Sequence, residues 1–166
     1  MQDDPIQPGQ IRRLAGGFEG CLERWMGHKQ ETVWRMLTEP PQFLQWLAPG
    51  SIELRKGGQV HIDFGDSGVA IDSTVLAFDP PRLLAYSWSS GDQPNRPLRW
   101  ELDTIDRGTA LTLTVQLPAG EDIAKACAGF EAHLDMLAAA LEGVPIRFPF
   151  DRYRAARRAY QELLPE

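Results

Sequence analysis

The strongest constraint on the fold is an alternation of apolar and polar residues, with a period of two, between residues 51 and 117. The alternating apolar positions fall in four segments, at residues 60–64, 84–88, 98–102 and 111–117. A period of two places apolar side chains on one face of a strand and polar side chains on the other. Short turn sequences rich in glycine, proline and aspartate separate the segments, which predicts an antiparallel meander. One face of such a sheet is apolar and needs a cover.

A long helix predicted at residues 121–142 supplies that cover. Its first turn carries acidic residues, which suit the positive end of the helix dipole, and Gly143 and Pro145 end it. Apolar residues recur at steps of three and four and therefore line one side. We predict an α+β fold in which a curved antiparallel sheet wraps around this helix and leaves an apolar pocket between them. The apolar side of the helix holds Ile123, Cys127, Phe130, Leu134, Leu137 and Leu141.

Three further elements are predicted around this unit. Residues 18–25 suit a first strand, and residues 30–39 and 42–47 suit two short helices separated by a pair of prolines. Residues 1–17 show little periodicity and several prolines and glycines, so we predict a flexible N-terminal arm.

The C-terminal segment differs from the rest of the chain in charge. Residues 152–164 have the spacing of a further helix, and the segment from residue 143 to the end carries five arginines and three acidic residues. This basic helix docks either on the acidic body of its own chain or on a partner, and both alternatives are open at this point.

Composition narrows the class of protein. The chain has 166 residues, a formal net charge of −6 and 43% hydrophobic residues, which is typical of one globular domain. An acidic balance disfavours a nucleic-acid partner. We find no apolar run of about 20 residues that would span a membrane, and no secretory signal, so we expect a cytoplasmic protein. Cys21 and Cys127 are expected to be reduced thiols.

Motifs for metal binding and catalysis are missing from the sequence. His28, His61 and His133 do not cluster with other ligand types at metal-binding spacing, so we predict no metal and no cofactor. We assign no catalytic residue, because there is no Gly-x-Ser-x-Gly motif and no Cys/His catalytic signature. Glu101 and Asp103 lie on the polar face of a predicted strand, which is typical of a solvated surface.

His133 is the polar residue of most interest. It is three residues from Phe130 and four from Leu137, which places it beside the apolar side of the long helix. An imidazole titrates near neutrality, so His133 could serve the pocket as a polar anchor or as a general acid or base. The alternative is a flanking histidine that hydrogen-bonds to a strand or to water.

Several local motifs resemble one family. The segment ETVWRMLTEP at residues 31–40 is similar to the VW-x-x-L-T-x-P opening of homologues of the activator of the heat-shock-protein ATPase, and WLAP at residues 46–49 resembles their W-x-x-P motif. The pairs Gly57-Gly58 and Gly108-Thr109 follow in the family's order. The resemblance covers residues 18–143 and places the chain near the START-like (SRPBCC, pollen-allergen-like helix-grip) superfamily. Where the family often has Gly-Trp, this chain has Gly129-Phe130, which removes an indole N–H donor.

The resemblance implies a helix-grip domain at residues 18–143, with six to seven strands and two short helices around the long helix. Residues 144–166 lie outside the resemblance, and their spacing predicts a helical extension of the same domain. The resemblance also implies a binding or carrier protein for a hydrophobic or aromatic small molecule in an internal cavity. The alternatives are a cyclase- or hydrolase-type enzyme and a co-chaperone-like interaction module, and a homodimer through the basic helix is also open. The expected pocket residues are Trp46, Phe64, Ser73, Tyr86, Trp88, Trp100, Phe130, His133, Leu134 and Leu137.

Overall fold

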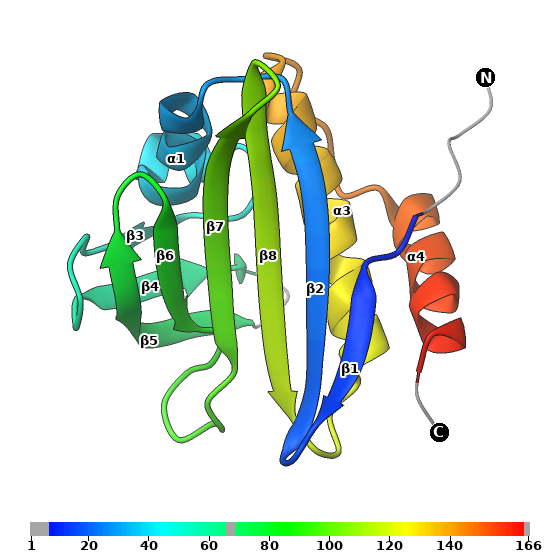
Figure 1. The fold of residues 1–166 in the computed structure, drawn as a ribbon. Coiled ribbons are helices and arrows are strands. Elements are labelled where there is room, and N and C mark those ends of the chain that lie inside the picture. Colours follow the sequence, from blue (N-terminus) through cyan, green and yellow to red (C-terminus); the bar gives the residue numbers. More distant parts are fainter. Residues whose placement is uncertain (1–6, 66–68, 165–166) are drawn as a thin grey trace.

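The computed structural model describes residues 7–65 and 69–164, and within those ranges the strands form one antiparallel sheet of eight strands. The strand order is β1-β2-β8-β7-β6-β5-β4-β3, so β3 to β8 form a meander and β2 closes on β8 (Figure 1). The strands are β1 (Gln10–Leu14), β2 (Gly17–Met26), β3 (Gly50–Ile52), β4 (Gln59–Asp63), β5 (Ala70–Asp79), β6 (Leu83–Ser87), β7 (Pro97–Ile105) and β8 (Gly108–Pro118).

Helices cover one face of this sheet. The helix α3 (Ile123–Leu141) lies behind β2 and β8 (Figure 1). Two short helices, α1 (Gln30–Thr38) and α2 (Pro40–Phe43), pack beside its C-terminal half, and α4 (Phe150–Glu162) packs against α3 on the side of β1. The layers are therefore a sheet, a central helix and smaller helices at two of its sides.

The patterns of apolar residues account for this arrangement. In β4, and in β8 from Thr109 onward, buried and less buried residues alternate, as the period of two predicts. The long helix is confirmed: Asp122 caps it by accepting a hydrogen bond from the backbone N–H of Lys125 at 3.0 Å. Cys127, Leu134 and Leu137 on its inner side are fully buried, so the predicted α+β fold is confirmed.

The sheet has eight strands where we expected six to seven. The strand β1 forms within residues predicted as a flexible arm, because it pairs with β2 as a hairpin although few of its side chains are buried. Residues 1–6 of that arm lie outside the described residues. The strand β5 has no clean alternation because a register shift between Val75 and Ala77 interrupts its pairing with β6. The second short helix is also shorter than predicted and continues to Leu47 as turns.

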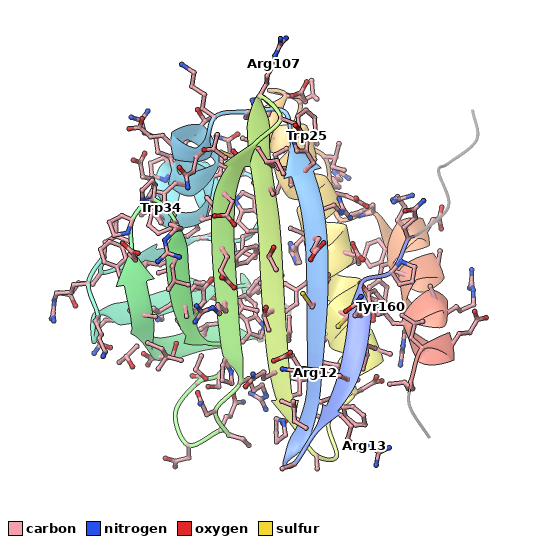
Figure 2. All side chains as sticks on the ribbon, in the orientation of Figure 1. Arg12, Arg13, Trp25, Trp34, Arg107 and Tyr160 are labelled. Atoms are coloured by element: carbon pink, nitrogen blue, oxygen red, sulfur yellow. The ribbon has the colours of Figure 1, made fainter. Side chains whose placement is uncertain are left out.

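The basic C-terminal helix docks on its own chain. Arg152 pairs with Asp135 of α3 at 2.7 Å, and the Tyr160 hydroxyl donates to Glu131 of α3 at 2.6 Å. Arg24 of β2 contacts both carboxylates, at 2.8 Å to Glu131 and 3.0 Å to Asp135. Figure 2 shows Tyr160 reaching from α4 toward β1. Of the two open alternatives, the structure therefore shows docking on the acidic body, and a homodimer stays a prediction.

The closest approach of the sheet to α3 gives a first testable prediction. A Cβ added at Gly20 of β2 would lie 2.3 Å from the Sγ of buried Cys127. We expect Gly20→Ala to lower the free energy of unfolding by about 1–3 kcal/mol, because overpacking forces the helix outward. Urea unfolding measures the effect. In the double variant with Cys127→Ala most of that loss should return, and purely additive losses would contradict this account.

Candidate functional site

A groove of about 860 Å³ lies between α3 and the sheet. Side chains from β5, β8, α3 and α4 line it, together with the segments that follow β4 and β6. It opens to solvent at Val69, which is 48% exposed. The lining residues are Phe64, Val69, Ala70, Ile71, Trp88, Ser90, Gln93, Arg96, Val115, Leu117, Glu121, Asp122, Lys125, Ala126, Gly129, Phe130, His133 and Tyr153.

Aromatic rings form one wall of the groove. Trp88 lies edge-to-face with Phe130 at 5.3 Å and with Phe64 at 5.8 Å between ring centroids. Phe64 in turn lies 6.0 Å from the ring of His133, and His133 lies 5.5 Å from Phe148 in the loop before α4. Edge-to-face pairs hold each ring in a defined orientation. The wall is therefore a connected set of rings that runs from β6 across α3 to the α3–α4 loop.

Charged side chains lie along another part of the groove. Arg96 makes a two-pronged contact with Glu121, at 2.6 and 2.9 Å, and its guanidinium also donates to the Trp88 carbonyl at 3.3 Å. The hydrogen bond from Arg96 holds the pKa of Glu121 below its ordinary value. This ion pair joins the loop before β7 to the start of α3, and so fixes the end of the helix that borders the groove.

His133 is the histidine that lines the groove. Its Nδ1 lies 3.0 Å from the carbonyl oxygen of Trp46, the residue where the α2 region turns toward β3. Burial lowers the pKa of His133 below its ordinary value, and the contact with the Trp46 carbonyl opposes that shift only partly. The imidazole is therefore favoured in its neutral form. The expected alternative of a flanking histidine bonded to a strand does not describe it, because the partner lies in the segment between α2 and β3.

Four of the ten expected pocket residues line the groove: Phe64, Trp88, Phe130 and His133. The structure places the other six outside the lining. Trp46 and Trp100 pack edge-to-face at 5.7 Å deep in the core, and Leu134 and Leu137 are fully buried on the inner side of α3.

Tyr86 and Ser73 are likewise outside the groove lining. Tyr86 is 1% exposed and burial raises the pKa of its hydroxyl, whereas Ser73 donates to the Ser87 carbonyl at 2.7 Å across the β5–β6 region. Both residues point to the same face of the sheet as the groove, but nearby side chains cover them. A period of two identifies the face of a strand and not the depth at which each residue lies.

Fourteen of the eighteen lining residues were not expected, among them Arg96, Glu121, Lys125, Gly129 and Tyr153. The Arg96–Glu121 pair joins residues 25 positions apart, which no local spacing reveals. Tyr153 was assigned only to the apolar side of the last helix. Gly129 appeared only as part of a family motif, yet a Cβ added there meets no atom within 4 Å, so this glycine leaves open space in the groove.

Within the described residues, the structure shows neither a metal site nor a membrane-spanning helix. In residues 7–65 and 69–164, no three His, Cys, Asp or Glu side chains come together in a way that could hold a metal ion. Among the described helices, none combines the length and the apolar composition that a bilayer crossing requires.

Comparison with known families identifies the chain. The family model "Activator of Hsp90 ATPase homolog 1-like protein" matches residues 28–142, more than half of the sequence. The chain belongs to this family. The expected place in the START-like (SRPBCC) superfamily is thereby confirmed. No curated protein matches the chain in a sequence comparison.

Solved structures of family relatives share the fold. CalU16 from Micromonospora echinospora is 20% identical with a TM-score of 0.77, over 93% of this chain and 94% of that one. The Aha1 dimer from Colwellia psychrerythraea is 17% identical with a TM-score of 0.63, over 75% of this chain and 96% of that one. DynU16, from the dynemicin biosynthetic locus, is 28% identical with a TM-score of 0.70, and the match covers 76% of this chain and 48% of that one.

The lowered pKa of His133 predicts a pH dependence of stability. A base whose pKa falls on folding binds protons more weakly in the native state, so stability is lost as pH drops below the ordinary value of 6.5. We expect the free energy of unfolding to decline by up to about 1.4 kcal/mol per pH unit in that range from this residue. Urea unfolding at pH 7.5 and 5.5 should show a smaller decline in His133→Asn.

His61, which is exposed on β4, provides the matched control. His61→Asn should keep the wild-type decline. The carboxylates with lowered pKa values, Glu19, Glu53 and Glu121, start from an ordinary value of 4.5 and lose their contribution only at lower pH. An equal decline in wild type and His133→Asn would rule out His133 as its source.

Proposed function

We propose that this protein binds an apolar, aromatic small molecule in the groove between α3 and the sheet. The observation that carries the proposal is the groove itself, with a volume of about 860 Å³ and a wall of connected aromatic rings. Small-molecule sites are typically clefts of roughly 300–1,000 Å³ lined by apolar side chains with a few polar groups. A cytoplasmic carrier of such a molecule fits this description.

The wall favours a flat, aromatic ligand over a flexible chain. Trp88, Phe64 and Phe130 present ring edges and faces that are already fixed by their mutual contacts. A ring that stacks on them loses little additional side-chain entropy from the protein, because those rotamers are set before binding. Aromatic pairs also contribute about 0.5–1.5 kcal/mol beyond the burial of their area.

Binding is favoured over catalysis by the chemistry of the lining. The two cysteines do not line the groove, and Cys127 is fully buried with a pKa raised by burial to about 12, which suppresses its thiolate. Two of the polar sites of the groove, the Arg96–Glu121 pair and His133, interact with different partners.

Filling the groove tests the proposal. The neutral fluorescent probe N-phenyl-1-naphthylamine should bind the wild-type protein saturably, with a Kd on the order of 10–100 μM for a ligand of this size. Gly129→Trp directs an indole into the open space at Gly129 and should weaken binding at least about tenfold. Fluorescence titration measures both affinities.

Gly129→Ala is the matched control for this experiment. It adds only a methyl group where no atom lies within 4 Å, and it should keep the affinity while stabilising α3 by up to about 1 kcal/mol. Circular dichroism would establish that both variants are folded. Equal affinity in wild type and Gly129→Trp would locate the probe elsewhere and contradict the proposal.

A further inference from the structure

The tautomer of His133 follows from its hydrogen bond. A carbonyl oxygen can only accept, so the Nδ1 that lies 3.0 Å from the Trp46 oxygen must carry the proton. In the neutral ring the other nitrogen, Nε2, then has a lone pair and no hydrogen. The second position of this imidazole is thus a hydrogen-bond acceptor of fixed orientation.

That acceptor is not used by the protein. In residues 7–65 and 69–164, no hydrogen bond to Nε2 of His133 is formed, and the rings on either side, Phe64 and Phe148, carry no N–H or O–H. Among the same residues, the buried side-chain polar atom without a partner is Nε of Arg157, so Nε2 of His133 does not belong to that class. Because His133 lines the groove, we place its unpaired Nε2 on the groove side of the ring.

The ring is also held in place from behind. The Trp46 carbonyl that receives Nδ1–H belongs to a residue that is 1% exposed, and the indole N–H of Trp46 donates to the Met36 carbonyl at 2.7 Å. Two successive hydrogen bonds therefore connect the C-terminal turn of α1 to the imidazole. Flipping the ring would bring a C–H group against the Trp46 oxygen and lose that bond. Burial, which disfavours protonation, acts in the same direction by keeping Nε2 an acceptor.

We infer that the aromatic ligand carries a hydroxyl group, and that Nε2 of His133 accepts its hydrogen bond. The inference rests on the proposed function and specifies the ligand class. A phenol combines a flat ring, which suits the wall of Phe64, Trp88 and Phe130, with an O–H donor in the ring plane. A carboxylate is disfavoured at this point, because an ionised acid offers no hydrogen to a lone pair. An arene without a donor leaves Nε2 desolvated and unpaired, which costs affinity.

A matched pair of probes tests this selectivity. 2-Naphthol and 2-methoxynaphthalene share the ring system, and only the first has a hydroxyl hydrogen. Isothermal titration calorimetry at pH 7.5 should show wild-type protein binding 2-naphthol about five- to tenfold more tightly than 2-methoxynaphthalene. In His133→Asn the amide N–H can still donate to the Trp46 carbonyl, but the acceptor at the Nε2 position is gone. This variant should therefore bind the two probes with about equal affinity.

Two further variants complete the design. His133→Phe keeps a ring between Phe64 and Phe148 without any nitrogen, and it should also lose the preference, which guards against misfolding of a single variant. His61→Asn, at an exposed histidine outside the groove lining, should retain the wild-type preference. Circular dichroism confirms the fold of each protein before titration.

The outcomes separate this inference from the function on which it rests. Equal wild-type affinity for the two probes would overturn the hydroxyl selectivity and leave aromatic binding intact. A preference that persists in His133→Asn but is lost in Tyr153→Phe would overturn it by assigning the contact to the Tyr153 hydroxyl. Failure of wild-type protein to bind either probe would contradict the proposed function itself, and the inference with it.

Discussion

The structure depends on one constraint: a single helix has to cover the apolar face of an eight-stranded sheet. The helix α3 has 19 residues, which makes it about 28 Å long and about 10 Å wide with its side chains. Eight strands spaced by about 4.8 Å extend over roughly 34 Å. Even a curved sheet therefore presents more apolar face than α3 covers. The helices α1 and α2 close one side of the remaining space, and aromatic side chains line the rest, which is the groove.

The position of α3 is fixed by contacts of two kinds. Toward the sheet, Gly20 has no side chain, so the helix can approach until the Sγ of Cys127 lies where a Cβ of residue 20 would be. Toward α4, Glu131 and Asp135 are paired with Arg24, Arg152 and the Tyr160 hydroxyl. Glu131 is 5% exposed, and a buried carboxylate without partners would destabilise the fold by several kcal/mol. This network holds α4 against α3, and with it Tyr153 at the groove and the Phe148 loop beside His133.

Sequence patterns predicted the elements better than the site. The alternation at residues 60–64 and 111–117 and the apolar side of α3 are local, so β4, β8 and the helix followed from spacing alone. The strand β1 could not be found this way, because its pairing with β2 buries few of its side chains. For the pocket, the inward face of each strand was identified correctly, but Trp100 and Phe64 look alike in the sequence. Trp100 packs on Trp46 in the core, whereas Phe64 lies beside His133 at the groove, and this difference depends on how the helices lie on the sheet, a long-range property.

The same geometry explains why polar contacts in the groove come from side chains. A site bounded by a sheet offers few free backbone hydrogen-bonding groups, because the strands use theirs in pairing. Polar recognition then falls to side chains of α3 and of the segments around it. Phe130 adds aromatic bulk to the wall and brings no hydrogen-bonding group to it. The Trp46 carbonyl takes up the one N–H of the neutral His133 ring. What this part of the groove presents to a ligand is therefore an acceptor, and selectivity there depends on the ligand bringing the donor.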